Sequence, residues 1–228
     1  MKTRVYIDGF NLYYGSLKGT AYRWLDLAAF CDRLFPKNTI DKIHYFTAKI
    51  SARSGDPHGP ASQQAYLDAL GSLPRVEIHY GKFQENVVSM VNVEHDPVTN
   101  RWRKDASGQA VFKLDGAGQP VRVWALKTEE KGSDVNLAAH LLRDVYQGHC
   151  TIPIVISNDS DLLTPIRLAK TDCGARIGLA LPRPKGSNAL KGLADFREHI
   201  RTHHLSRSQL PNPVQLADGT VIHKPPHW

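Results

Sequence analysis

Three aspartates of this chain follow apolar segments at points where a strand would end or a helix would begin. Asp8 follows the run Thr3–Ile7, Asp159 comes just after the apolar run 152–157, and Asp134 opens a helical pattern. Two unit charges about 4 Å apart repel by about 4 kcal/mol at an effective dielectric constant of about 20, so clustered carboxylates need a proton or a cation. Oxygen ligands favour Mg²⁺ or Mn²⁺, and such a hard cation lowers the pKa of a bound water that can attack phosphorus. These residue types therefore predict metal-assisted hydrolysis of a phosphodiester.

Three further polar residues stand beside these aspartates in the sequence. Asp161 lies in the first turn of the helix after Asp159 and is predicted to make an outer or second-metal contact, although an acid there also complements the helix dipole. Asn11 is a catalytic candidate that could equally cap its helix, and Ser157 could orient Asp159 or cap the helix. An aspartate after a strand is also a common turn residue, so each position keeps a structural alternative. The predicted metal ligands are Asp8, Asp134, Asp159 and Asp161.

Alternating strand and helix patterns position these residues. Apolar and β-branched runs predict strands at 3–8, 42–48, 75–80, 152–157 and 175–181, and apolar stripes predict helices at 24–35, 61–70, 133–148 and 158–170. Strands that alternate with helices form a mostly parallel sheet covered on both faces, and ligands bind beyond the carboxyl ends of its strands. The sequence therefore predicts an α/β fold with its polar loops at one edge of the sheet.

Three segments depart from this alternation. Residues 82–126 contain short valine-rich runs of period two separated by turn signals, which predicts a β-hairpin arm inserted in the α/β frame. Residues 187–204 favour helix or turn. Residues 206–228 carry four prolines and no sustained period, so we expect a loosely packed tail after a domain that spans 1–205.

Four sequence blocks resemble those of a known protein family. They read VYIDGFNLYYG at 5–15, YGKF at 80–83, EEKGSDVNLAAHLL at 129–142 and VISNDSDLLTPI at 155–166. In this order they resemble the NYN domains, relatives of the PIN-domain nucleases, and especially their bacterial branch. The resemblance implies a PIN-like three-layer α/β/α fold and metal-dependent ribonuclease activity. It also implies an acidic cluster at Asp8, Asp134, Asp159 and Asp161, with Asn11 beside it.

Cations are predicted to hold the polyanionic substrate, because Lys and Arg neutralise phosphates and the binding weakens as salt rises. The candidates near the acidic edge, each of which could also be a solvated surface charge, are Lys131, Arg167, Arg183 and Lys185. The arm adds a basic and aromatic run typical of single-strand binding, formed by Arg101, Trp102 and Arg103. We expect the arm to lean over the metal site and contact single-stranded RNA, although packing of Trp102 across strands explains that residue equally well.

Two other classes of function stay open. An apolar strand that ends in Asp8-Gly9 is also typical of haloacid-dehalogenase-type phosphatases, but those enzymes need a second aspartate two residues on, and position 10 is Phe. The non-enzymatic alternative is a nucleic-acid-binding module whose acids are structural or whose activity is lost. His199 and His203 are four residues apart, but no HExxH motif or nearby cysteine accompanies them, so no metal site is predicted there.

Composition agrees with these expectations. The 228 residues include 29 Lys and Arg against 22 Asp and Glu, a formal charge of +7 that suits a polyanionic partner. Three distant cysteines without CxxC spacing indicate neither a disulfide framework nor a zinc finger, and favour a reducing cytoplasm. There is no apolar leader and no run of about 18 apolar residues, so a membrane span is not expected. The prediction is a cytoplasmic, Mg²⁺- or Mn²⁺-dependent ribonuclease, with a homodimer left open.

Overall fold

The computed structural model describes residues 2–52, 55–183 and 186–228. The chain divides into two compact units. The first runs to Lys82 and resumes at Glu130, and the second is Phe83–Glu129.

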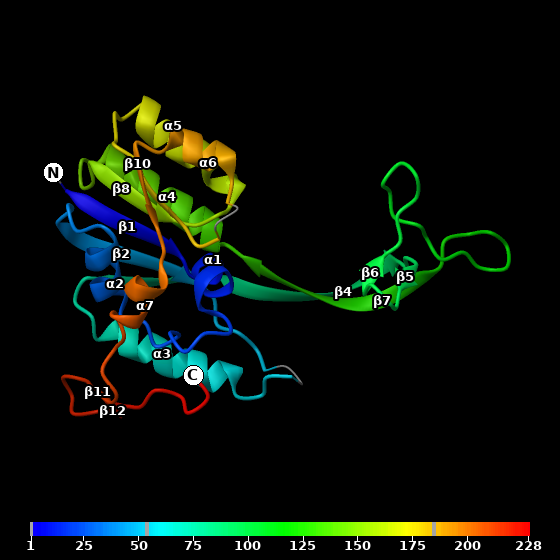
Figure 1. Ribbon diagram of the computed structural model, residues 1–228, viewed down its shortest axis with the longest axis horizontal. Coiled ribbons are helices and arrows are strands. Elements are labelled where there is room, and N and C mark those ends of the chain that lie inside the picture. Colours follow the sequence, from blue (N-terminus) through cyan, green and yellow to red (C-terminus); the bar gives the residue numbers. More distant parts are fainter. Residues whose placement is uncertain (1, 53–54, 184–185) are drawn as a thin grey trace. The chain divides into compact units, whose positions relative to one another are not determined.

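A six-stranded sheet forms the centre of the first unit (Figure 1). Its strands are β1 (Thr3–Asp8), β2 (Ile40–Thr47), β3 (Val76–Tyr80), β8 (Ile152–Ile156), β9 (Gly178–Leu181) and β10 (Phe196–His199). Their order is β10-β9-β8-β1-β2-β3, and all neighbours pair in parallel. The chain winds outward from β1 in one direction through β2 and β3, and in the other through β8, β9 and β10. The point where this direction changes lies between β1 and β8.

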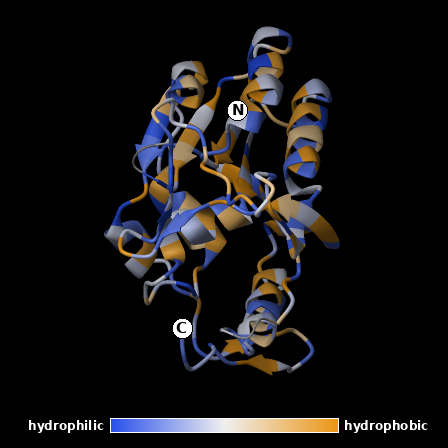
Figure 2. Ribbon diagram, turned by 90° about the vertical axis from the view of Figure 1, so that its right-hand side faces the viewer, coloured by the Kyte–Doolittle hydropathy of each residue, from blue (hydrophilic) through white to orange (hydrophobic). Residues whose placement is uncertain are grey.

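Helices cover both faces of this sheet, which confirms the predicted three-layer α/β/α architecture. One face carries α4 (Ser133–Tyr146), α5 (Leu163–Thr171) and α6 (Asn188–Leu193), and the other carries α2 (Leu27–Leu34), α3 (Gly59–Gly71) and α7 (Thr202–Ser206). Successive residues of a strand point to opposite faces. Tyr6 accordingly packs in the core that α4 and α5 close, whereas Val5 and Ile7 pack in the core on the other side. Coloured by hydropathy, the helices show both hydrophobic and hydrophilic residues (Figure 2), as expected for elements that bury one side.

The second unit is built on the paired strands β4 (Lys82–Val91) and β7 (Arg122–Lys131). A short ladder joins β5 (His95–Asp96) to β6 (Arg101–Trp102). Two further turns are held by aspartates, since Asp105 Oδ1 accepts from the backbone of Ser107 and Gln109, and Asp115 does the same for Ala117 and Gln119. The segment is therefore the expected β-hairpin insertion, although β7 continues five residues past the predicted end at 126.

One predicted helix start was wrong by three residues. The helix expected from residue 24 begins at Leu27, because Asp26 Oδ1 accepts from Ala28 N and Ala29 N and so fixes the N-terminus there. The predicted start at residue 133 is confirmed, since Ser133 is the first helical residue of α4 and Gly132 precedes it at φ +99°.

The predicted helix 158–170 is divided. A 3₁₀ turn, η2 (Ser160–Leu162), comes first and α5 follows it. Residues 187–204 contain the strand β10, which the helix-or-turn prediction missed. The four residues of β10 are mostly exposed, so they show little hydrophobic pattern. Their extended conformation is determined by pairing with β9.

The expectation of a loosely packed tail was also wrong. Leu210 and Val214 are buried, Trp24 Nε1 donates to the Pro211 carbonyl at 3.0 Å, and the Trp228 ring packs on Trp24. A short hairpin of β11 (Val214–Gln215) and β12 (Val221–Ile222) lies within this segment. Among the described residues, no helix combines the length and apolar character needed to cross a bilayer.

Candidate functional site

Asp8 ends β1 at the point where the sheet order changes direction. Its carboxylate is 4 % exposed and caps the short helix α1 (Gly9–Leu12): Oδ1 accepts from Asn11 N at 2.9 Å, and Oδ2 accepts from Asn11 Nδ2 and from Ser157 Oγ. Burial raises the pKa of Asp8, and the bonds from Asn11 and Ser157 oppose that rise. Asp8 is therefore the N-cap of α1, and the alternative in which Asn11 caps this helix is wrong.

The loop after β8 runs beside Asp8. The buried Ser157 hydroxyl donates to Asp8 Oδ2 at 2.9 Å and accepts from Asp159 N at 3.0 Å, so one hydroxyl connects the ends of two neighbouring strands. Asp159 in turn caps η2 by accepting from Asp161 N at 2.9 Å. Asn158 N donates to Asn11 Oδ1 at 3.3 Å, and the buried Asn158 Nδ2 has no hydrogen-bond partner within the described part of the chain. Ser157 thus contacts both Asp8 and Asp159, whereas the sequence predicted a contact with Asp159 only.

Asp134 joins the cluster from α4. Burial raises its pKa to about 6, and the charges of Asp8, Asp159, Glu130 and Asp161 add to that rise. The structure therefore brings all four predicted acids into electrostatic contact at one edge of the sheet. Glu130, which the sequence did not single out, accepts from Ser133 Oγ at 2.8 Å at the entry to α4.

The chemistry of the cluster matches a hard cation such as Mg²⁺ or Mn²⁺. Its donors are carboxylate and amide oxygens, and the charges of neighbouring carboxylates add to the rise that burial causes in the pKa of Asp134. The three ligand atoms that lie within 4.8 Å of one another in the described part of the chain come from histidines and not from these acids. Mg²⁺ commonly keeps several waters and one or two carboxylate ligands, so the open cluster fits a cation held partly through water.

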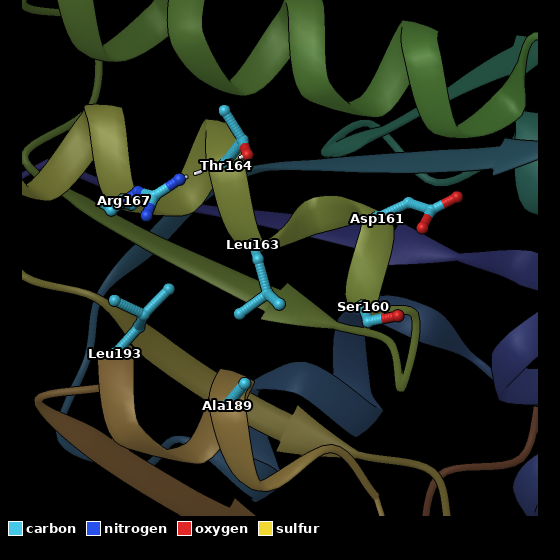
Figure 3. Close-up of a pocket in the computed structure, with 7 residues that line it drawn as sticks. All are labelled: Ser160, Asp161, Leu163, Thr164, Arg167, Ala189 and Leu193. Carbon is cyan, nitrogen blue, oxygen red and sulfur yellow. Dashed lines mark hydrogen bonds between the residues drawn. The ribbon is translucent and has the colours of Figure 1, made fainter.

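A pocket of about 600 Å³ adjoins the acidic cluster between η2, α5 and α6 (Figure 3). The residues that line it are Ser160, Asp161, Leu163, Thr164, Arg167, Ala189 and Leu193. Asp161 belongs to both the pocket and the cluster, and the Arg167 guanidinium donates to Thr164 Oγ1 at 3.4 Å on the opposite side. The pocket therefore offers a carboxylate, a guanidinium and an apolar wall to a small molecule.

The other predicted cationic residues have different surroundings. Lys131 is exposed at the end of β7, and Arg183 N donates to Asn158 Oδ1 at 3.4 Å. Lys185 lies outside the described residues. Arg101, Trp102 and Arg103 belong to the second unit, where Arg103 pairs with Glu94 and the Lys104 ammonium lies 4.6 Å from the centre of the Trp102 ring.

Sequence reasoning missed a group of three histidines, His44, His79 and His140. An Ile-His-Tyr triplet recurs at 43–45 and 78–80, which was a usable signal, since both triplets fall in predicted strands. His140 lies beside the apolar stripe of α4, and no sequence pattern singled it out.

The fold and site define a doubly wound α/β protein with an acidic site at its topological switch point, where such folds bind ligands. No family model matches the chain. The chain is 31 % identical over 254 aligned positions to the 6-hydroxy-3-succinoylpyridine 3-monooxygenase HspA of Pseudomonas putida, and the alignment covers 100 % of this chain and 75 % of that protein. The chain therefore belongs to the family of that protein. A protein of unknown function from Vibrio parahaemolyticus has a similar structure, with a TM-score of 0.47 and 14 % identity over 88 % of this chain and 93 % of the other.

This relationship corrects the functional prediction. A relative that is 31 % identical along the whole of this chain is named a monooxygenase, which is an oxidative enzyme, so the predicted hydrolytic ribonuclease is wrong. Clustered carboxylates and a basic surface are compatible with many chemistries, and the inference from them to phosphodiester hydrolysis was too narrow. The resemblance to NYN domains, the RNA partner and the cytoplasmic location stay predictions.

Proposed function

We propose that the chain is an oxygenase that hydroxylates a small hydroxylated nitrogen heteroaromatic with a carboxylate-bearing side chain. The pocket beside the acidic site carries this proposal, because about 600 Å³ is a usual size for a small-molecule site. The name of the relative supports the substrate class, since it specifies a pyridine with a hydroxyl at position 6 and a succinoyl group at position 3.

Each part of such a molecule has a counterpart in the pocket. The Arg167 guanidinium would bind the terminal carboxylate, because its planar fork matches two carboxylate oxygens. Leu163 and Leu193 supply apolar surface for the ring, and Ser160 and Asp161 lie where the ring hydroxyl can hydrogen-bond. The substrate would thus be oriented with its hydroxyl toward the acidic cluster.

This orientation serves the chemistry of the ring. Positions 3 and 6 of a pyridine lie opposite each other, so a hydroxyl that gives up its proton at one position raises the electron density of the carbon at the other. A carboxylate that accepts the hydrogen bond of the hydroxyl assists that change. The overall reaction breaks the bond between ring carbon 3 and the acyl carbon, places one atom of O₂ on that ring carbon and releases the other as water, while a second water molecule takes up the acyl group as a carboxylic acid. It consumes two protons and two electrons from an added reductant of the reduced nicotinamide or reduced flavin class.

The acidic cluster is proposed to hold Mg²⁺ or Mn²⁺ through Asp8, Asp134, Asp159 and Asp161. When bound, the cation would lower the pKa of the nearby substrate hydroxyl. Asn11 and Ser157 hold Asp8 in position, so the carboxylate is oriented before the cation arrives.

The proposal is tested by following oxygen uptake and hydroxylated product with 6-hydroxy-3-succinoylpyridine, Mn²⁺ and reduced nicotinamide plus flavin. Arg167→Gln should raise KM roughly 10- to 100-fold with little change in kcat, because a hydrogen bond to a charged group contributes about 1.5–3 kcal/mol.

Arg197→Gln is the matched control, because Arg197 is an exposed arginine on β10 and does not line the pocket. It should leave both constants unchanged. Wild-type protein that takes up no oxygen with either reductant would overturn the proposed reaction. A normal KM in Arg167→Gln would remove the pocket as the substrate site.

A further inference from the structure

The three histidines meet between the sheet and α4, on a part of the molecule that the proposed oxygenase site does not use. His44 lies on β2, His79 on the edge strand β3 and His140 on α4. One ring nitrogen from each lies within 4.8 Å of the others. His44 is fully buried and the other two are half-buried, so small ions can reach the group from the sheet edge.

The nitrogens are spaced like ligands of one ion. His44 Nδ1 lies 2.9 Å from His79 Nε2, and two imidazole ligands of a tetrahedral Zn²⁺ lie about 3.3 Å apart, given Zn–N bonds of about 2.0–2.1 Å. The Glu77 carboxylate adds oxygens 3.9 Å from that His44 nitrogen and 3.7 Å from that His79 nitrogen. His140 Nδ1 accepts from Arg143 at 3.1 Å, a contact that a metal bond at this atom would replace.

A buried carboxylate orients His44. Asp144 Oδ2 lies 3.1 Å from His44 Nε2, and that nitrogen has no aligned hydrogen-bond partner among the described residues. Burial raises the pKa of Asp144, but hydrogen bonds from Arg4 and Tyr6 outweigh burial and lower the pKa to about 2, so the carboxylate is ionised. A carboxylate beside one ring nitrogen favours the tautomer that carries the proton on that nitrogen and leaves the lone pair of the other nitrogen free. Many histidines that bind metals are held by a carboxylate in this way. His44 Nδ1 is therefore directed at His79.

The rings are also held in the form that binds metal. Burial lowers the pKa of His44 to about 4, and burial together with the neighbouring His140 lowers the pKa of His79 to about 4. Neutral imidazole is the ligand form of histidine, so no proton has to leave these rings near pH 7.

From this arrangement we infer that His44, His79 and His140 form a binding site for a divalent transition-metal ion of the Zn²⁺ type, with Glu77 as an adjacent carboxylate ligand. Imidazoles suit zinc, copper, iron and nickel, whereas oxygen ligands suit magnesium and manganese, so this site and the acidic cluster should select different ions. His140 follows Asp134 by six residues, which is about 9 Å along the axis of α4. The inference does not depend on the proposed reaction.

The test is calorimetric titration of the metal-free full chain with Zn²⁺ in the presence of excess Mg²⁺. Wild type should bind one equivalent, and His140→Ala should weaken binding more than about 100-fold. Glu77→Gln should weaken it about 10- to 100-fold. Bound Zn²⁺ should also raise the Tm of wild type but not of His140→Ala, because a ligand that binds the native state stabilises it by an amount that grows with the logarithm of its affinity. The visible absorption of bound Co²⁺ reports the coordination geometry independently of activity.

Two variants keep the result interpretable. His140→Ala replaces a half-buried helical residue with the best helix former, so it should fold, and circular dichroism verifies this. His199→Gln combined with His203→Gln removes two exposed histidines and should bind Zn²⁺ like wild type. The inference is overturned if wild type binds no stoichiometric Zn²⁺, or if folded His140→Ala binds it with unchanged affinity.

Discussion

The two best-defined acids of the cluster differ in how their charge is compensated. Asp8 receives hydrogen bonds from Asn11 and Ser157, which stabilise its ionised form. Asp134 is half-buried and faces other carboxylates, so burial raises its pKa to about 6 and the neighbouring charges add to that rise. A cation or a proton relieves the repulsion between Asp134 and its neighbours. The negative charge of Asp134 that would bind a cation therefore destabilises the protein when no cation is bound.

Asp134→Asn should therefore stabilise the protein at pH 7.5 in the absence of metal. The pKa of Asp134 is higher in the folded protein than in the unfolded chain. The folded wild-type protein therefore loses stability as pH rises from the unfolded pKa of about 4 to the folded pKa of about 6. We expect the variant to gain about 1–2 kcal/mol at pH 7.5, discounted for the solvent that reaches the side chain, and to match wild type at pH 4. Urea denaturation at both pH values measures the difference.

Asp172→Asn, which removes an exposed charge at the end of α5, serves as the control and should change stability little at either pH. Millimolar Mn²⁺ should stabilise wild type more than Asp134→Asn. If Asp134→Asn is less stable than wild type at pH 7.5, the carboxylate is a structural cap and not a strained ligand.

At the scale of elements, α4 serves both candidate sites. Its first turn carries Asp134 to the acidic cluster, and nearly two turns later His140 faces the histidine group. The chain enters this helix through Gly132, whose φ of +99° turns the end of β7 into α4. Glu130 and Ser133 hold the entry by hydrogen bonds. The position of the acid thus depends on one glycine.

Gly132→Ala should lower the free energy of unfolding by about 1–2 kcal/mol, the usual cost of a left-handed conformation for a residue with a Cβ atom. A Cβ atom there would meet nothing closer than 3.9 Å, so backbone strain alone causes the loss. Thermal and urea denaturation measure it.

Gly71→Ala is the matched control. It lies at the end of α3, has ordinary φ and leaves space for a Cβ atom, so stability should hold or rise slightly. Equal effects of the two substitutions would contradict the assignment of strain to Gly132.

At the scale of the whole molecule, the C-terminal segment completes the core of the first unit. Trp228 packs against Trp24 and Tyr66 with ring centroids 6.3 and 5.7 Å apart. The Tyr66 hydroxyl donates to the Leu25 carbonyl at 2.8 Å, and Leu210 N donates to the Trp24 carbonyl at 2.9 Å. These contacts tie the last residues to the start of α2.

Trp228→Ala should consequently destabilise the protein by roughly 2 kcal/mol, less than truncation of a fully buried tryptophan because part of the ring is exposed. Trp124→Ala, at a tryptophan of the second unit that is 77 % exposed, should leave the main unfolding transition unchanged. A wild-type Tm in Trp228→Ala would mean that the final residues pack only weakly on the core.

The sequence by itself determined the alternation of strands and helices, the parallel sheet with two helical layers and the β-hairpin insertion. These features follow from local patterns: apolar runs such as 152–156, stripes such as that of α4, and turns held by Asp105 and Asp115. The same patterns placed Asp8, Asp134 and Asp159 at strand or helix ends, from which the acidic edge could be predicted.

Only the tertiary structure decided what depends on residues distant in the chain. Strand β10 exists because β9 pairs with it, and the C-terminal segment is ordered because Trp24 and Tyr66 receive it. His44, His79 and His140 look unremarkable one at a time, since a histidine on a strand or helix has no distinctive local pattern. The repeated Ile-His-Tyr triplet marks two of the three histidines, but only the register of β2 with β3 and the packing of α4 bring the three rings together.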